Sequence, residues 1–366
     1  MDASAQVICG KSQKLETEEG RTLIRMPDVI LFPPNERCCH SILSKRWKKL
    51  WINKELLPSC DVHSDASHIN TWIFAALCCK FQELKLDLYQ YNANKSLLPH
   101  CLFTFQSLTV LELYLFHDLK LLSTICLPNL KELKLSFITF VDDHSTQLFD
   151  GCLNVRKLTL DECTWKDEKF VFISSPMLKF LSICDLTWDD GGPNDCQVVT
   201  CGTNLKFFSY SGELKTDVCL YSSSLVNGRM DLRSVTVSEW DGKQREAVYH
   251  VHKLHKGFSS VESLTGSPVP LEDTPLPEKY EKKKKLQIGS STSLFIDTAK
   301  TIKIWRFAAT EKELYLIKVL LDVSSVLEKM YIWGGLSKQQ EILMLPRGST
   351  NCEIIFLRTL HKLIWA

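Results

Sequence analysis

NLKELKL, at residues 129–135, is one of seven copies of a short phrase that recurs between residues 81 and 237. Each copy holds an apolar residue, two variable positions, a second apolar residue, one variable position and a third apolar residue. The other copies read FQELKL, SLTVLEL, NVRKLTL, MLKFLSI, NLKFFSY and DLRSVTV. The middle apolar residues, here called anchors, are 27, 22, 25, 23, 27 and 27 residues apart: Leu84, Leu111, Leu133, Leu158, Leu181, Phe208 and Val235. A period in the twenties predicts a repeat protein.

The phrase predicts one β-strand per repeat. Side chains alternate across a strand, so the anchor and the apolar residue two positions later point inward, while the residue between them faces outward. An amphipathic helix also suits a spacing of three, but Thr, Ser and Val within the phrases favour strands. The pattern is typical of leucine-rich repeats, whose apolar faces are covered only by stacking. We therefore predict an α/β solenoid, an irregular leucine-rich-repeat horseshoe.

Composition narrows the function classes. The chain has 366 residues, of which 45% are hydrophobic and 24% charged, as in an ordinary soluble globular protein. The net charge of +1 gives no global field toward nucleic acid or a membrane surface. No window approaches the roughly 18 apolar residues that span a bilayer. We expect neither nucleic acid nor a membrane as a partner.

The fifteen cysteines are odd in number and irregularly spaced, and the first 19 residues hold no apolar signal-peptide core. A disulfide framework would need paired cysteines in an oxidising compartment. We expect reduced thiols that pack as small apolar residues. This favours the cytoplasm or the nucleus.

Residues 25–51 read RMPDVILFPPNERCCHSILSKRWKKLW. From Ser41 to Trp51, apolar residues recur at helical spacing with basic residues between them, which predicts a basic amphipathic helix. Such a helix either packs on its own domain or presents an apolar stripe to a partner.

This segment resembles the F-box of plant F-box/leucine-rich-repeat proteins. A Leu-Pro-Asp opening, a Leu-Pro turn and a Ser-x-Leu-Ser-Lys-Arg-Trp-x-x-Leu-Trp closing are typical of that motif. The opening here is Met26-Pro27-Asp28, the turn is Phe32-Pro33-Pro34, and the closing is SILSKRWKKLW at residues 41–51. The resemblance implies binding to a Skp adaptor, and through it to a cullin, by Pro27, Ile30, Ile42, Leu43, Trp47, Leu50 and Trp51.

The first helix of an F-box has no room in this sequence. Only Val29, Ile30 and Leu31 stand between Asp28 and the turn. Three residues do not complete a helical turn of about 3.6 residues with its hydrogen bonds. We expect an F-box-like helical remnant with weakened adaptor binding, and the rival interpretation is a segment that only caps the solenoid.

The C-terminal part predicts strand, helix, strand, short helix and strand. Thr301 to Phe307 alternates as a strand, Thr310 and Glu313 form a capping box before a helix, and strands follow at residues 329–333 and 352–357. The ending LPRGSTNCEIIF at residues 345–356 resembles that of the FBD domain of plant F-box proteins. The resemblance implies a C-terminal α/β FBD domain.

These observations divide the chain into five parts. The parts are a disordered tail (1–20), a truncated F-box-like segment (21–56), leucine-rich repeats (57–265), a linker or insertion (266–300) and an FBD-like domain (301–366). Within the repeats we also predict a helix over residues 64–79 and one more strand at residues 259–264.

We predict no metal, no cofactor and no catalytic site. The stretches at residues 142–144 and 189–190 offer ligands for a hard cation, but we expect them to be solvated loop residues, and the histidines at 250, 252 and 255 lack the spacing of a metal site. The lysine run at residues 282–285 is either a nuclear-import signal or a solvated loop. No nucleophile elbow, P-loop or paired-cysteine motif occurs. A hydrolase in an unrecognised fold is the remaining enzymatic alternative.

The resemblance implies a substrate-recognition subunit of an SCF-type ubiquitin ligase, in which the repeats and the FBD hold a target protein. The alternative is a repeat protein that binds partners but is decoupled from the ligase, because the first F-box helix is missing. The target is unknown, since the outward positions are diverse: Lys85, Glu112, Lys134, Thr159, Ser182 and Ser209.

Overall fold

The computed structural model describes the repeats and the C-terminal unit, with gaps. The described residues are 14–16, 22–24, 49–53, 73, 82–87, 98–121, 125–141, 145–166, 168–185, 194–212, 216–232, 254, 257–267, 298–334 and 336–358.

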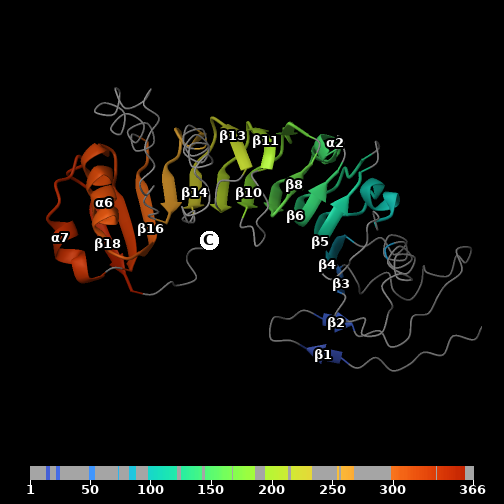
Figure 1. Cartoon of the computed structure of the whole chain (residues 1–366), viewed down its shortest axis with the longest axis horizontal. Helices are drawn as coiled ribbons and strands as arrows, with labels where there is room; N and C mark the ends of the chain where they lie inside the picture. The colour runs from blue at the N-terminus through green and yellow to red at the C-terminus, as the bar shows by residue number, and fades with distance from the viewer. Residues whose placement is uncertain are drawn as a thin grey trace, which may run out of the picture.

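One long parallel sheet runs through the molecule and follows an arc (Figure 1). Its strands lie in chain order along the sheet, each hydrogen-bonded to its neighbours, which confirms the predicted solenoid-like α/β fold. The strands on this path are β3 (Lys49–Asn53), β4 (Glu83–Asp87), β5 (Val110–Leu119), β6 (Glu132–Phe140), β7 (Lys157–Asp161), β10 (Phe180–Asp185), β12 (Phe207–Gly212), β14 (Asn227–Leu232), β15 (Ser263–Gly266), β16 (Thr301–Phe307), β17 (Lys329–Gly334) and β18 (Glu353–Leu357).

A second layer covers the outer side of the arc (Figure 1). It contains a 3-10 helix η3 (His100–Thr104), α2 (Ser145–Asp150), a short strand β8 (Thr164–Trp165) that pairs with β6, and a three-stranded parallel sheet. That sheet consists of β9 (Phe170–Ile173), β11 (Asn194–Cys201) and β13 (Thr216–Tyr221). The sequence phrase gave no sign of these outer strands.

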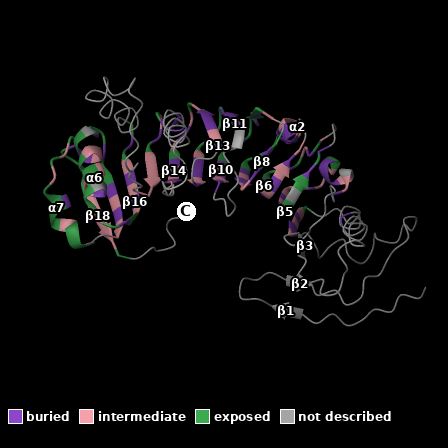
Figure 2. Ribbon diagram, viewed as in Figure 1, coloured by how far each residue is buried: buried purple, intermediate pink, exposed green. Residues whose placement is uncertain are grey.

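The anchors are stacked in register across the long sheet. Leu84 lies opposite Leu111, Leu111 opposite Leu133, and the series continues through Leu158 and Leu181 to Phe208. All six are at most 2% exposed. Figure 2 shows the same alternation of buried and less buried residues along the strands. The core is therefore a ladder of apolar side chains that each repeat shares with its neighbours.

Asparagine side chains join consecutive repeats at the start of three strands. The Nδ2 of Asn129 donates to the carbonyl of Gln106 (2.8 Å), and that of Asn154 donates to the carbonyl of Pro128 (2.6 Å). Asn204 does the same to Pro176 (2.7 Å). Each asparagine stands four residues before its anchor, so the same contact repeats along the solenoid and satisfies turn carbonyls that have no strand partner.

The seventh predicted strand is wrong in position. The strand that pairs with β12 is β14 at Asn227–Leu232, and Gly228 rather than Val235 occupies the anchor register opposite Phe208. A Cβ on Gly228 would lie 2.5 Å from the ring of Phe258. Phe258 is 1% exposed and its ring packs 5.7 Å from that of Phe208. A phenylalanine from another segment thus fills the space that an anchor side chain fills elsewhere.

The predicted extra strand begins later than expected, as β15, with Leu264 in the anchor register.

The N-terminal helix prediction is also wrong where the structure tests it. Lys49–Asn53, at the end of the predicted helix over residues 41–51, forms β3 and pairs in parallel with β4. Leu50 and Ile52 occupy the register positions opposite buried Leu84 and Leu86. The edge of β4 carries backbone groups that need partners, and a strand satisfies them where a helix would not. Ile73, inside the predicted helix 64–79, is helical and fully buried.

Residues of the predicted disordered tail also pair. Lys14–Glu16 forms β1, antiparallel to β2 (Thr22–Ile24), with Leu15 opposite Leu23. Exchange of backbone hydrogen bonds between two adjacent short segments outweighs the polar composition of the tail here.

The C-terminal elements agree with their prediction. β16 is followed by α6 (Glu311–Val323), β17, the short helices η5 (Leu336–Lys338) and α7 (Gln339–Leu343), and β18. Thr310 caps α6: its hydroxyl accepts from the Glu313 amide (3.3 Å), and the Glu313 carboxylate accepts from the Thr310 amide (2.9 Å). This unit has an apolar cluster of its own, yet β16 pairs with β15, so its strands prolong the repeat sheet.

The nine cysteines within the described ranges are free thiols. Burial raises the pKa of Cys152, Cys163 and Cys196 from 9.0 to about 12 in each case. Burial also raises the pKa of Tyr210, and the carboxylate of Asp185, which accepts a hydrogen bond from its hydroxyl, raises it further. These groups are held in their neutral forms and pack as part of the core.

We expect Phe258→Ala to destabilise the protein by about 3 to 5 kcal/mol, because it empties a buried site. Gly228→Leu alone should destabilise by overpacking against the ring. The double variant should be more stable than the sum of the two effects predicts, since the leucine occupies the vacated space. Guanidinium unfolding measures all three, with Phe172→Ala, at a 48% exposed position, as the control. Strict additivity would contradict the proposed replacement.

We also expect the free energy of unfolding to fall as pH rises from 9 toward 12. The unfolded Cys163 thiol ionises in this range, whereas the folded thiol, with a pKa of about 12, keeps its proton. Stability is therefore full below pH 9 and decreases by about 1.4 kcal/mol per pH unit for such a group. The free energy of unfolding of Cys163→Val should fall less steeply with pH than that of wild type. The free energy of unfolding of Cys201→Val, at an exposed position, should follow wild type. Equal slopes for all three would refute this assignment.

Candidate functional site

The inner face of the long sheet is the surface best placed to bind a partner. Strand alternation sends the anchors into the core and the residues beside them to the other side of the sheet. Because the second layer covers the outer side of the arc (Figure 1), that other side is the inner one. Register pairing aligns them in rows across the strands. The first row, one position after each anchor, is Lys85, Glu112, Lys134, Thr159, Ser182, Ser209, Arg229, Thr265, Lys303, Tyr331 and Ile355.

The N-terminal part of this face is charged, and two ion pairs span neighbouring strands there. Lys85 Nζ lies 2.9 Å from the Glu112 carboxylate, and Lys157 Nζ lies 3.3 Å from that of Glu132. Lys134 is exposed between them. Half-exposed pairs of this kind stabilise by less than about 1 kcal/mol. Beyond them Thr159, Ser182 and Ser209 are small and polar, and in the row before the anchors Phe180, 47% exposed, lies beside Phe207.

The C-terminal part of the face is aromatic and cationic. The guanidinium of Arg229 on β14 lies 4.6 Å from the centre of the Trp305 ring on β16, and that of Arg306 lies 4.9 Å from the same ring. Tyr331 and Trp333 on β17 stack with ring centres 6.0 Å apart. Lys303 lies opposite Tyr331 in the register. The sequence interpretation treated Thr301–Phe307 only as an alternating strand and did not use its outward residues.

Two buried polar atoms in this part of the face have no hydrogen-bond partner. They are Nε1 of Trp305 and Oδ1 of Asp231, which stands two residues after Arg229. Asp231 is 6% exposed. Buried polar groups are nearly always hydrogen-bonded, but Nε1 of Trp165, elsewhere in the described part of the fold, has no partner either, so these atoms do not set the area apart.

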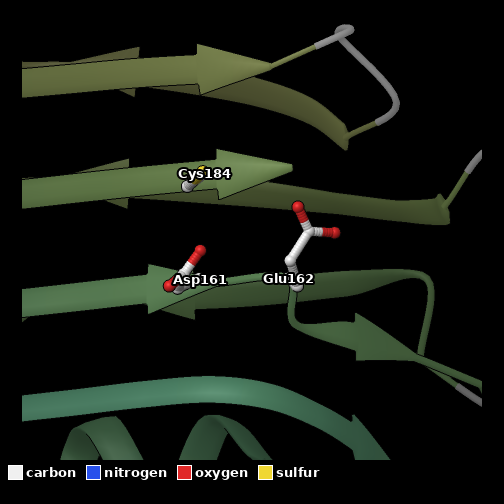
Figure 3. Close-up of side chains that lie close together, drawn as sticks. All are labelled: Asp161, Glu162 and Cys184. Atoms are coloured by element: carbon white, nitrogen blue, oxygen red, sulfur yellow. The ribbon is translucent and has the colours of Figure 1, made fainter. Parts of the chain in front are cut away.

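Asp161, Glu162 and Cys184 gather at the end of β7 and β10 (Figure 3), with their candidate ligand atoms within 4.8 Å of one another. Backbone geometry accounts for the position of Glu162, whose φ of 52° turns the chain and whose N–H donates to the Cys184 carbonyl (2.8 Å). Two carboxylates and one thiol mix hard and soft donors and fall short of the usual four or more ligands. The cluster does not fit a built metal centre.

The other predicted positions lie mainly outside the described residues. This holds for Pro27, Ile30, Ile42, Leu43 and Trp47, and for the stretches at 142–144, 189–190 and 282–285. The histidines at 250, 252 and 255 are outside them as well. Leu50 and Trp51 lie on β3, in the sheet. In the described part of the chain, no helix is long and apolar enough to cross a membrane.

Comparison with known proteins confirms the resemblance. Residues 69–195 match the family model for the leucine-rich repeats of the FBD-associated F-box protein At5g56370. The F-box/FBD/LRR-repeat protein At2g04230 of Arabidopsis thaliana is 25% identical over 271 residues, covering 61% of this chain and 59% of the relative. The F-box/LRR-repeat protein At3g59190 of the same plant is 26% identical over 310 residues, covering 70% and 79%.

The chain thus spans about three fifths of the length of the first relatives that it matches. The relatives carry the names of F-box and leucine-rich-repeat proteins and not of enzymes. No solved structure matches the chain.

We expect neither Zn²⁺ nor Ca²⁺ to raise the melting temperature of the protein, because the Asp161 cluster offers too few matched ligands. Differential scanning fluorimetry with each metal chloride tests this expectation. A metal-dependent increase that disappears in both Cys184→Ala and Asp161→Asn would show that the cluster binds the ion.

Proposed function

We propose that the protein is a substrate-recognition subunit of an SCF-type ubiquitin ligase. The inner face of the sheet binds a target protein, and the F-box-like segment binds a Skp adaptor and through it a cullin. The observation that carries the proposal is the match of residues 69–195 to the leucine-rich repeats of an FBD-associated F-box protein. The same residues build the stacked sheet from β4 onward.

The surface supports recognition rather than chemistry. A continuous parallel sheet offers a broad face on which successive strands contribute one outward residue each to every row, as extended protein ligands require. The C-terminal unit, which we assign as an FBD, continues the same face through β16, β17 and β18. Target contacts can therefore extend from the repeats into this unit.

The proposed mechanism is positioning. A receptor that holds both a target and a cullin-bound enzyme raises the effective concentration of a target lysine at that enzyme. This chain then needs no catalytic residue of its own. We expect the cytoplasm or the nucleus as its compartment, because the cysteines are odd in number and irregularly spaced.

A second candidate function has a specific observation in its favour. Lys49–Asn53 overlaps the closing of the F-box-like motif, yet it forms the first strand of the sheet. Residues committed to a sheet are not on a helix offered to an adaptor. This supports a repeat protein that binds partners without coupling to the ligase, in which the N-terminal segment only caps the solenoid.

Co-purification with a plant Skp adaptor and its cullin separates these functions. For a working receptor, we expect the full chain to retain the adaptor and Trp47→Ala to weaken that retention by tenfold or more. Trp333→Ala, at the opposite end of the sheet, should retain the adaptor like wild type. A further variant, with about six residues inserted after Asp28 to restore roughly two helical turns, tests the missing helix.

Retention by the restored variant alone would establish the decoupled protein and end the ligase assignment for the natural chain. No retention by any variant would have the same consequence. Equal losses in Trp47→Ala and Trp333→Ala would mean that the first substitution acts through folding, and circular dichroism of both variants checks this.

A further inference from the structure

Six residues on β14, β16 and β17 form what we call the Trp305 patch. They are Arg229, Lys303, Trp305, Arg306, Tyr331 and Trp333. We propose that this patch binds an extended acidic segment of a partner protein. The inference deepens the proposed function, on which it rests, by naming the chemistry of the target.

Charge distinguishes the patch from the rest of the inner face. Within the described ranges neither Lys303 nor Arg306 forms a salt bridge, whereas Lys85 and Lys157 each pair with a glutamate. Three cations gather in the patch, and Asp231 is the carboxylate beside them on β14, almost completely buried. A net positive area between aromatic rings favours carboxylate ligands.

The arginines are held in place before any partner arrives. Arg229 reaches from β14 to Trp305 on β16, across β15. Thr265, which lies opposite Arg229 on β15, and Ser267, just after the strand, are small enough to let the long side chain pass. Arg306 stacks on the same indole, which leaves the edge of its guanidinium open for the two oxygens of a carboxylate. Such preorganisation reduces the entropy lost on binding.

The aromatic side chains supply the apolar part of the contact. Tyr331 and Trp333 are each partly exposed and stack on one another. Tryptophan, tyrosine and arginine are the residues that most often dominate binding energy at protein interfaces. From β14 to β17 the patch crosses three strand spacings, about 14 Å, which corresponds to about four residues of an extended chain. The inferred ligand is thus a short acidic stretch.

Fluorescence anisotropy with the full chain and labelled synthetic peptides tests the proposal. The probe is an alternating Glu-Gly peptide, and alternating Gln-Gly and Lys-Gly peptides are its charge controls. We expect the protein to bind the Glu-Gly peptide and neither control. Arg306→Glu and Trp305→Ala should each weaken binding by tenfold or more. Lys134→Glu makes the same charge change on the paired part of the face and should leave the affinity within twofold of wild type.

Equal binding of the Glu-Gly and Gln-Gly peptides would overturn the proposal. So would an equal loss in Arg306→Glu and Lys134→Glu, because the effect would then follow net charge and not the patch. Circular dichroism checks that Trp305→Ala is folded, and Arg306→Glu, at an exposed position, provides the same test without removing a large side chain. Adaptor co-purification with the same variants separates the two proposals. A variant that loses peptide binding but retains the adaptor has a defect in the patch alone. Peptide binding by a chain that does not retain the adaptor would support the patch in a protein that is decoupled from the ligase.

Discussion

In-register stacking of parallel strands is the constraint on which the rest of this structure depends. No repeat can cover its own apolar anchor or satisfy the backbone groups at the edge of its own strand, so each needs the next one in fixed register. Leu84, Leu111 and Leu133 meet this requirement by direct stacking. The need for a paired neighbour explains why residues 49–53 form β3 at one end of the sheet, although their sequence predicted a helix. It also explains why β16 continues the sheet where the repeats give way to the C-terminal unit.

The ladder tolerates departures in side chains but not in register. At Gly228 the anchor side chain is missing, yet the strand keeps its pairing because the Phe258 ring supplies the missing volume. Asparagines join the turns before some strands, and serine hydroxyls do so elsewhere, as Ser224 does by donating to the Leu205 carbonyl (3.0 Å). Each substitute satisfies the same packing or hydrogen-bonding need with different chemistry.

Outward positions are free of this constraint, so their side chains can differ in charge and size from one strand to the next. The N-terminal part of the inner face places lysines beside glutamates on neighbouring strands, so its charges largely cancel. The C-terminal part places Arg229 and Arg306 against Trp305 instead, and within the described residues Lys303 and Arg306 form no salt bridge. Two surfaces of opposite character thus lie on one sheet, because the core dictates only every second residue of each strand.

The sequence alone determined the solenoid, the positions of six anchors and the strand and helix order after residue 300. Those features depend on local periodicity and on capping residues close together in the chain, as Thr310 and Glu313 are. The tertiary structure alone decided that β3 is a strand, that Phe258 replaces an anchor, that an outer sheet covers the middle repeats, and that Arg229 meets Trp305. Each of these features depends on a contact with a segment that is distant in the sequence. The repeating phrase predicts which side chains of a strand are buried, but not which distant segment packs against them.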